Sequence, residues 1–391
     1  MHDVLVVGLG AMGSATLHAL ASRGVDVVGV DAYDPPHSLG STHGRSRIIR
    51  EAYYEHPAYV PLVRRAYAAW AQLEAASGVH LFLRTGGLNI GARDSALVAG
   101  AIASAERHGL LVEVLSAREI NGRHPAFSVP ADMVGVFEAS AGMLFPEACI
   151  TAFLQVARSL GADVRPNTCV RALDRSASGI RAMTDAGALC ARRVVVCAGP
   201  WTAPLLATLG IALPLVVTRQ TMHWLAAPSD ASVVRPDKLP VALIEHNDGR
   251  IFYTMPDVGD GVKAAIHHEG CAVDATAVDR AVHASDTQVV EDLVARFLPG
   301  AEARIRESAV CLYTNTPDHH FIIDTGEGMP DVVVVSACSG HGFKFASAIG
   351  DIAARIALGE SAAMELSHFA ARRFGVSDRE TAHPDARSAP E

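Results

Sequence analysis

The chain has 391 residues, of which half are hydrophobic and 19% are charged, so it can build a large core and is not a disordered protein. Its net charge of -9, without a block of Lys or Arg, makes nucleic acid and anionic membrane surfaces poor candidate partners. Seven scattered cysteines argue against a disulfide framework and favour a reducing compartment such as the cytoplasm. We expect no cleaved secretion signal, and no apolar run reaches the roughly 18 residues of a membrane span.

The first thirty residues predict one βαβ unit. A buried strand is expected at 3–8, a helix at 11–23 ended by Gly24, and a second strand at 25–30 that Asp31 closes. Between them lies the sequence Gly8-Leu9-Gly10-Ala11-Met12-Gly13.

The rest of the chain mixes helices and strands. Further helices are predicted at 58–76, 94–108, 151–160, 286–297 and 342–357. Further strands are predicted at 164–170, 193–198 and 332–336. Between 214 and 315 the alternating segments 215–224, 241–245, 250–255 and 261–267 are typical of a largely antiparallel sheet. The pattern predicts an α/β protein of two domains, each built from separated segments.

The glycine motif predicts a dinucleotide site, because a helix N-terminus beside the end of a parallel strand attracts a pyrophosphate. Gly8 allows a tight turn, Gly10 lets phosphates approach the backbone, and Gly13 lets helix and strand pack closely. Asp31 follows Gly13 by 18 residues, where a carboxylate can bind the adenosine ribose. The motif does not choose between FAD and NAD, although the free Asp31 argues against the 2′-phosphate of NADP.

Several later segments, taken with the motif, resemble the monomeric sarcosine oxidase family. That family includes N-methyltryptophan oxidase and belongs to the flavoproteins similar to D-amino acid oxidase. The resemblance spans residues 2 to 360 in a single order. It rests on Asp34-Pro35-Pro36-His37, Gly40-Ser41-Thr42-His43-Gly44, Arg47-Ile48-Ile49-Arg50, Ala309-Val310-Cys311-Leu312-Tyr313, Phe321-Ile322-Ile323-Asp324 and Ser339-Gly340-His341-Gly342-Phe343-Lys344-Phe345.

The resemblance implies a Rossmann-type FAD-binding domain and an α+β substrate domain with a largely antiparallel sheet. We expect the FAD-binding domain at 1–83, 146–213 and 317–375, the substrate domain at 84–145 and 214–316, and a polar tail at 376–391.

Cys311 resembles the cysteine that holds FAD covalently through the flavin 8α-methyl group. Without the resemblance, a cysteine in such an apolar run is usually a small core residue. The chemistry needs a thiolate near an electron-poor ring.

Two arginines and a lysine are implied to bind anionic groups. On residue type alone, Arg47 and Arg50 would be solvated arginines. In the family reading, Arg47 lies over the flavin ring, while Arg50 and Lys344 hold the substrate carboxylate, which suits charge-assisted hydrogen bonds.

Lys263 resembles the lysine that promotes oxygen reduction on the flavin face opposite the substrate, although most strand lysines are simply edge charges. Strand alternation predicts Lys263, Ala265 and His267 on one face, with His268 on the other. His267 and Tyr253 match residues of the substrate site.

The remaining implied site residues surround the cofactor and the substrate. His43 and Ser46 are expected under the flavin, with His341 and Gly342 approaching from the other side. A buried strand ending in Ala198-Gly199-Pro200 is expected to flank the FAD. The other implied contacts are Ala11, Met12, Ser41, Val170, Gly340 and Lys344 to FAD, and Tyr313 to substrate.

Three departures from the family pattern bear on the flavin environment and on substrate size. Arg45 stands where relatives carry an acid, Ser46 replaces a threonine, and the segments 241–244 and 254–257 differ from the sarcosine-selective pattern. No Cys/His pair has zinc spacing, and His319 and His320, taken as adjacent strand residues, would face opposite ways, so no metal is expected.

The resemblance thus implies an FAD-dependent oxidase of secondary amino acids, N-methylated or cyclic, that reduces O₂ to hydrogen peroxide as a monomer or small homo-oligomer. Three alternatives stay open: a deaminating oxidase of primary amines, an NAD-dependent dehydrogenase, and a flavin-binding protein or subunit without turnover.

Overall fold

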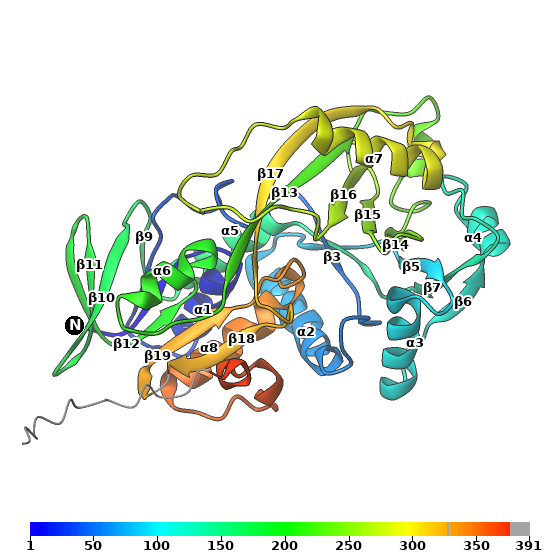
Figure 1. Ribbon diagram of the computed structural model, residues 1–391. Helices are drawn as coiled ribbons and strands as arrows, with labels where there is room; N and C mark the ends of the chain where they lie inside the picture. Colours follow the sequence, from blue (N-terminus) through cyan, green and yellow to red (C-terminus); the bar gives the residue numbers. More distant parts are fainter. Residues whose placement is uncertain (327, 376–391) are drawn as a thin grey trace, which may run out of the picture.

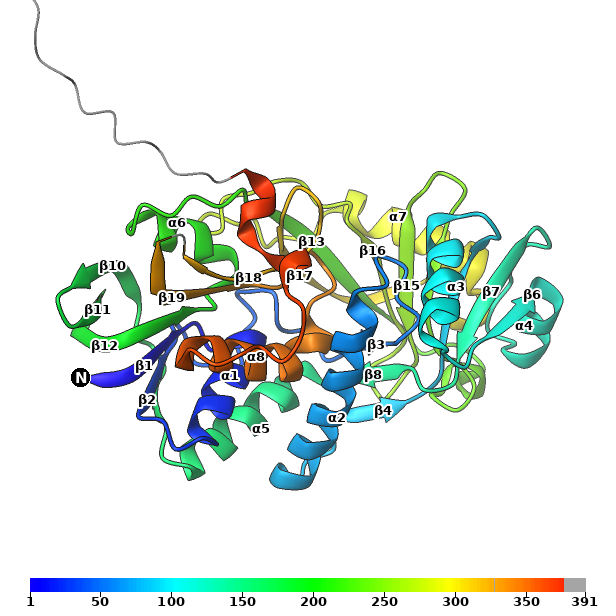
Figure 2. The ribbon, with the colours of Figure 1, turned by 90° about the horizontal axis from the view of Figure 1, so that it is seen from below.

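A computed structural model describes residues 1–326 and 328–375 and contains three β-sheets (Figures 1 and 2). The first sheet has eight strands, with neighbours in the order β10-β11-β12-β1-β2-β9, while β19 pairs with β12 and β18 pairs with β19. Strands β9, β2, β1, β12 and β19 are mutually parallel. The strand bounds are β1 His2–Val7, β2 Val27–Val30, β9 Asp163–Arg165, β10 Val170–Ser176, β11 Gly179–Thr184, β12 Gly187–Val196, β18 Ile322–Gly326 and β19 Met329–Ser336.

Helices bury both faces of this first sheet. In β1, Val4 and Val6 pack with α1, α2, α5 and α8, whereas Leu5 and Val7 pack on the opposite face with α6. Burial on both faces explains the unbroken apolar runs of its parallel strands. The helix bounds are α1 Ala11–Ala21, α2 Tyr59–Ser77, α5 Pro146–Ser159, α6 Thr202–Ala207 and α8 Ala346–Leu358.

The second sheet also has eight strands, in the order β17-β13-β16-β15-β14-β5-β7-β6. Every pairing is antiparallel except that of β14 with β5. Figure 1 shows β13 and β17, which belong to this second sheet, in the middle of the molecule. The strand bounds are β5 Gly87–Ala92, β6 Glu113–Ser116, β7 Met133–Glu138, β13 Val216–Leu225, β14 Val241–Glu245, β15 Ile251–Met255, β16 Lys263–His267 and β17 Ile305–Asn315.

Over β15 and β16, helices cover one face of the second sheet. Phe252, Ala264 and Ile266 pack against α7 (Ala284–Phe297), in a core that α4 (Ala117–Arg123) extends. Helix α3 (Ala96–His108) packs on the opposite face, at the far end of the sheet, against Val136 of β7. The alternate residues of β15 and β16 therefore face the first sheet.

A small third sheet connects these halves. Its strands are β3 (Arg47–Ile49), β8 (Gly142–Leu144) and β4 (Phe82–Arg84), and β8 lies in the centre. Residues 34–50 run from the first sheet to this sheet.

The α/β fold class is confirmed, and several element boundaries differ from prediction. Helix α5 begins at Pro146 rather than at 151, because proline is well placed in the first helical turn. The strand predicted at 164–170 is two strands, separated at Asn167, whose φ is 52°. The helix predicted from 342 begins with a 3-10 turn at Phe343–Phe345.

Two histidines were also predicted wrongly. His319 and His320 lie in the loop between β17 and β18 rather than in a strand, and His319 has a φ of 58°. In the described part of the chain, every helix is too short or too polar to span a bilayer. The predicted tail 376–391 lies outside the described residues.

Candidate functional site

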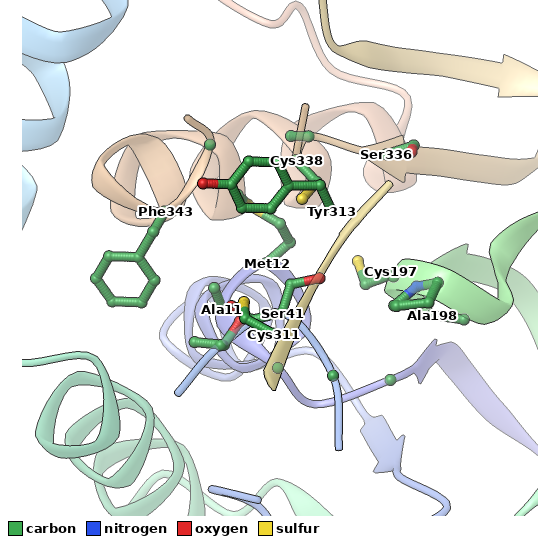
Figure 3. A pocket seen from close by; sticks show the side chains of 18 of the residues that line it. Ala11, Met12, Ser41, Cys197, Ala198, Cys311, Tyr313, Ser336, Cys338 and Phe343 are labelled. Carbon is green, nitrogen blue, oxygen red and sulfur yellow. Dashed lines mark hydrogen bonds between the residues drawn. The ribbon is translucent and has the colours of Figure 1, made fainter. Parts of the chain in front are cut away.

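A cavity of about 520 Å³ lies between the two large sheets (Figure 3). Its walls are the glycine-rich turn after β1, residues 31–50, the uncovered face of the second sheet, and the segment before α8. Figure 3 shows Ala11 and Met12 of α1, Ser41, Cys311 and Tyr313 of β17, and Phe343 around this space. The cavity therefore joins segments from the beginning, the middle and the end of the chain.

The glycine-rich turn is packed too tightly for side chains. A Cβ on Gly8, whose φ is 88°, would lie 2.5 Å from the carbonyl oxygen of Cys197, and one on Gly13 would lie 1.6 Å from that of Gly8. The Asp31 carboxylate accepts a hydrogen bond of 2.7 Å from Leu9 N–H and so fixes the turn. Gly10, by contrast, faces the cavity, since the nearest atom to an added Cβ is Thr42 Oγ1 at 3.7 Å.

Cys311 lies on the cavity wall with a guanidinium beside its sulfur. Arg47 Nη2 is 3.8 Å from Cys311 Sγ and donates a 3.0 Å hydrogen bond to the carbonyl of Ser41. Burial raises the pKa of the Cys311 thiol, while the nearby Arg47 opposes that shift. The arginine therefore favours the thiolate, which is the nucleophilic form of cysteine.

Arg50 and Lys344 are both buried and both line the cavity. Arg50 is paired with Glu55 at 3.0 Å and donates a 2.8 Å hydrogen bond to the carbonyl of Ala52. Burial raises the pKa of the Glu55 carboxyl, but the neighbouring cations, Arg50 above all, outweigh that effect and keep it below its usual range. Glu55 is therefore an anion held where the resemblance implies the substrate carboxylate.

The Lys344 ammonium begins a chain of hydrogen bonds. It donates to the carbonyl of His341 at 2.7 Å and to Tyr53 Oη at 3.3 Å, and Tyr53 Oη lies 2.6 Å from His341 Nδ1. Burial, together with the like charge of Arg50, lowers the pKa of Lys344 to about 7. Burial also lowers the pKa of His341 to about 3, so its ring is neutral and can accept from Tyr53.

Lys263 is buried behind the cavity wall and anchors the loop that carries Arg47. Its ammonium donates to the carbonyls of Gly44 at 2.7 Å and Ser46 at 2.9 Å. The Glu147 carboxylate accepts from the N–H groups of Gly44 and Arg45 on the same loop. Burial, with the neighbouring Arg47, lowers the pKa of Lys263 well below its usual value.

The face of β15 and β16 that points to the cavity carries Tyr253 and His267. His267 Nδ1 lies 3.3 Å from Tyr313 Oη. Burial lowers the pKa of His267 far below its usual value and raises that of Tyr253 to about 12, so both groups are neutral near pH 7. As predicted, Lys263 and His267 point away from α7, against which Ile266 of the same strand packs. The prediction that His268 lies on the other face is wrong, because β16 ends at His267 and His268 has a φ of 66°, which brings its ring to 4.0 Å from that of His267 and 5.5 Å from that of Tyr313.

Residues 3–356 match the family model described as FAD dependent oxidoreductase. The monomeric sarcosine oxidase of Streptomyces avermitilis is 36% identical to the chain over 380 residues, which cover 96% of this chain and 98% of that protein. The chain belongs to the family of FAD-dependent oxidoreductases. The N-methyl-L-tryptophan oxidase of Yersinia pestis is 35% identical to this FAD-dependent oxidoreductase over 375 residues, covering 95% of this chain and 99% of that protein. The predicted family and enzyme class are therefore confirmed.

Solved structures confirm the fold. NikD, described as an unusual amino acid oxidase essential for nikkomycin biosynthesis, superposes with a TM-score of 0.85 at 24% identity, covering 95% of this chain and 97% of that one. Glycine oxidase from Geobacillus kaustophilus superposes with a TM-score of 0.82 at 19% identity, covering 95% and 98%. The predicted combination of an FAD-binding Rossmann domain and a substrate domain is the fold of this FAD-dependent oxidoreductase.

The cavity fits the dinucleotide that the family uses. Its phosphate end has the exposed backbone of Gly10, and Ser41 Oγ is a buried hydroxyl without a hydrogen-bond partner among the described residues. Most residues predicted for the site line this cavity, whereas Gly13, His43, Ser46 and Lys263 do not. The residues that line it are Gly8, Gly10, Ala11, Met12, Asp31, Ser41, Arg47, Arg50, Val170, Gly199, Tyr253, His267, Cys311, Tyr313, Gly340, His341, Gly342 and Lys344.

Sequence reasoning did not identify three residues of this region: Tyr53, Glu55 and Glu147. Tyr53 and Glu55 lie a few positions after Arg50, and a buried cation in a low-dielectric site calls for an anion nearby. That requirement was a signal that could have identified Glu55. Glu147 gives no such signal, because it contacts the loop at Gly44 only through tertiary packing.

Proposed function

We propose that this FAD-dependent oxidoreductase oxidises a small secondary amino acid, N-methylated or cyclic, such as sarcosine. The carbon–nitrogen bond becomes an imine, which hydrolyses in water, and O₂ is reduced to hydrogen peroxide. One observation supports this more than any other. A cysteine beside a guanidinium and two buried cations, Arg50 and Lys344, face one cavity that also contains the dinucleotide turn.

Gly10, Asp31 and Ser41 would hold FAD in this proposal. Cys311 Sγ would form a thioether with the flavin 8α-methyl carbon as one C–H bond of that carbon breaks, and the two electrons released would pass by way of the flavin to O₂. Bound FAD supplies the acceptor for two electrons from the substrate and passes them on to O₂. Arg47, beside Cys311, favours the thiolate needed for attachment and presents positive charge where negative charge develops on reduction.

The substrate carboxylate would bind to Arg50 and Lys344. A planar guanidinium and an ammonium are the partners that a carboxylate needs when it leaves water. The incoming carboxylate competes with Glu55 for Arg50, because Glu55 already pairs with that guanidinium. We assign Tyr313 to the same substrate site.

The amine would react in its neutral form, so no general base is required. His267 and Tyr253 lie on one wall of the cavity, and burial keeps both uncharged. A neutral imidazole next to Tyr313 can hydrogen-bond an amine N–H without competing for its lone pair. Lys263 supplies the cation that promotes oxygen reduction, since a fixed positive charge stabilises superoxide as it forms.

The first test is acid precipitation followed by a peroxide assay. We expect the yellow colour to remain in the pellet of the wild-type protein and to move to the supernatant for Cys311→Ser. Cys338→Ser is a matched control, because Cys338 also lines the cavity, and its pellet should stay yellow. Yellow supernatant from the wild type would contradict attachment at Cys311.

The substrate class is tested by a peroxide-coupled screen of sarcosine, other N-methyl amino acids, proline and pipecolate. Peroxide from these secondary amines, with formaldehyde from sarcosine, is the expected result. Ammonia release from primary amino acids instead would favour a deaminating oxidase. Bound flavin without peroxide from any amine would favour a flavin-binding protein.

We also propose the two-domain division given above and a reducing compartment such as the cytoplasm. The division is supported by the two large sheets, which draw their strands from alternating segments of the chain. The compartment is supported by the free cysteines, including the buried Cys149 and Cys197.

A further inference from the structure

Glu138 is a buried carboxylate that the proposed function does not use. It is the last residue of β7, only 4% of its surface is exposed, and it lies behind the segment that follows Arg50. A buried carboxylate is costly unless hydrogen bonds satisfy its oxygens. Its partners therefore indicate what it holds in place.

Three donors converge on the Glu138 carboxylate. The N–H of Glu51 lies 2.9 Å from Oε1 and 3.0 Å from Oε2, and the N–H of Ala52 lies 2.8 Å from Oε2. Ser140 Oγ donates to Oε1 at 2.7 Å. Two of the three donors are successive backbone groups, so Glu138 fixes the course of the chain immediately after Arg50.

Ala52 links this carboxylate to the guanidinium. While its N–H donates to Glu138, its carbonyl oxygen accepts from Arg50 Nη1 at 2.8 Å and from Asn89 Nδ2 at 3.4 Å. Asn89 is on β5, which pairs with β7 in the sheet, so both supports come from one rigid element. A shift of Ala52 would move the acceptor that orients Arg50.

Residues 51–54 also contact Lys344, the second cation of the site. Arg50 lies over the rings of Tyr53 and Tyr54, 4.5 and 5.0 Å from their centroids. Tyr53 in turn accepts a hydrogen bond from Lys344. Residues 51–54 therefore connect the two cations. Glu138 fixes the first two residues of this segment, Glu51 and Ala52.

We propose that Glu138 is a positioning residue that fixes Ala52 and, through it, orients the Arg50 guanidinium for the substrate carboxylate. The inference rests on the proposed function, in which Arg50 binds that carboxylate. Glu138 does not line the main cavity and is not expected to touch substrate or cofactor.

The test compares Glu138→Gln with a matched control, Glu74→Gln. Glu74 is also a carboxylate that accepts from two successive backbone N–H groups, those of Leu81 at 2.7 Å and Phe82 at 3.2 Å, but it lies outside the cavity lining. For Glu138→Gln we expect KM for sarcosine and the Kd for propionate to rise about tenfold, with kcat within about twofold. Glu74→Gln should leave all three unchanged.

A double-mutant cycle separates positioning from a general loss of structure. In an Arg50→Lys background, Glu138→Gln should change the propionate Kd by less than about twofold, because the group it positions is gone. An unchanged Kd in the single variant, or an undiminished tenfold effect in the Arg50→Lys background, would overturn the proposal. Propionate titration by calorimetry needs no turnover, so absence of peroxide with N-methyl amino acids would contradict the proposed function without deciding this test.

Discussion

At the scale of single residues, the candidate site depends on cations that are buried close together. Arg50 keeps its charge under any condition, whereas the pKa of Lys344 falls to about 7 through burial and the neighbouring Arg50. A carboxylate binds the protonated amine of Lys344 more tightly than the neutral one. Affinity for carboxylates should therefore fall as the pH rises through about 7.

We predict that the Kd for propionate rises about three- to tenfold between about pH 6 and pH 8.5, because Lys344 loses its proton in this range. Propionate isolates this effect, since it lacks the amine whose own titration would act in the opposite direction. Calorimetric titration of the FAD-loaded protein measures it. In Lys344→Gln the propionate Kd should be higher than in the wild type and nearly independent of pH. A wild-type Kd that stays constant over this range would show that Lys344 does not contribute its charge.

At the scale of elements, the helices behind the glycine-rich turn pack at very short range. A Cβ on Gly350 of α8 would lie 2.5 Å from the backbone carbon of Ala15 in α1. The close approach of α8 sets the position of α1, whose first turn carries Ala11 and Met12 at the cavity. Helix packing thus determines where the dinucleotide turn lies.

Gly350→Ala should lower the free energy of unfolding by about 1–3 kcal/mol, because the new methyl group must push the helices apart. Gly122→Ala is the control, since Gly122 is also helical but nothing lies within 4 Å of an added Cβ. That change should be neutral or slightly stabilising. Thermal unfolding followed by circular dichroism compares the two variants. Equal thermal unfolding midpoints for the two variants would show that α1 and α8 accommodate the added methyl group without a loss of stability.

At the scale of the whole molecule, the cavity lies between two sheets that contribute different parts of the site. The first sheet provides the glycine-rich turn, and the second provides Cys311, Tyr253 and His267. A dinucleotide bound here would contact both sheets at once. Removing the dinucleotide should therefore lower the free energy of unfolding of the whole protein and not of one half alone.

We predict that Cys311→Ser, stripped of FAD by gel filtration in mild denaturant, unfolds at a lower temperature than the same variant with FAD restored. The difference should grow with the FAD concentration, because a ligand bound only to the native state stabilises it by mass action. Differential scanning fluorimetry with an added dye reports the midpoints. Wild-type protein treated in the same way should keep its FAD and its midpoint. A Cys311→Ser midpoint that does not respond to FAD would contradict a cofactor bound between the sheets.

Local sequence patterns determined much of the fold. The apolar run of β1, the glycines after it and the alternation along β16 are short-range signals, because strand and helix periodicity involve neighbouring residues. The ordered motifs identified the family and the enzyme class, and the matching relatives confirm both. The roles of the individual site residues remain predictions.

Only the tertiary structure decided which carboxylates support the site. Glu138 contacts the backbone of Glu51 across 87 positions, and Glu147 contacts Gly44 across 103. The hydrophobic periodicity of the sequence does not indicate such contacts, because they form only when the two large sheets and the small sheet between them pack together. Residue types and spacing therefore identified the groups that can do chemistry, whereas packing selected the groups that hold them in place.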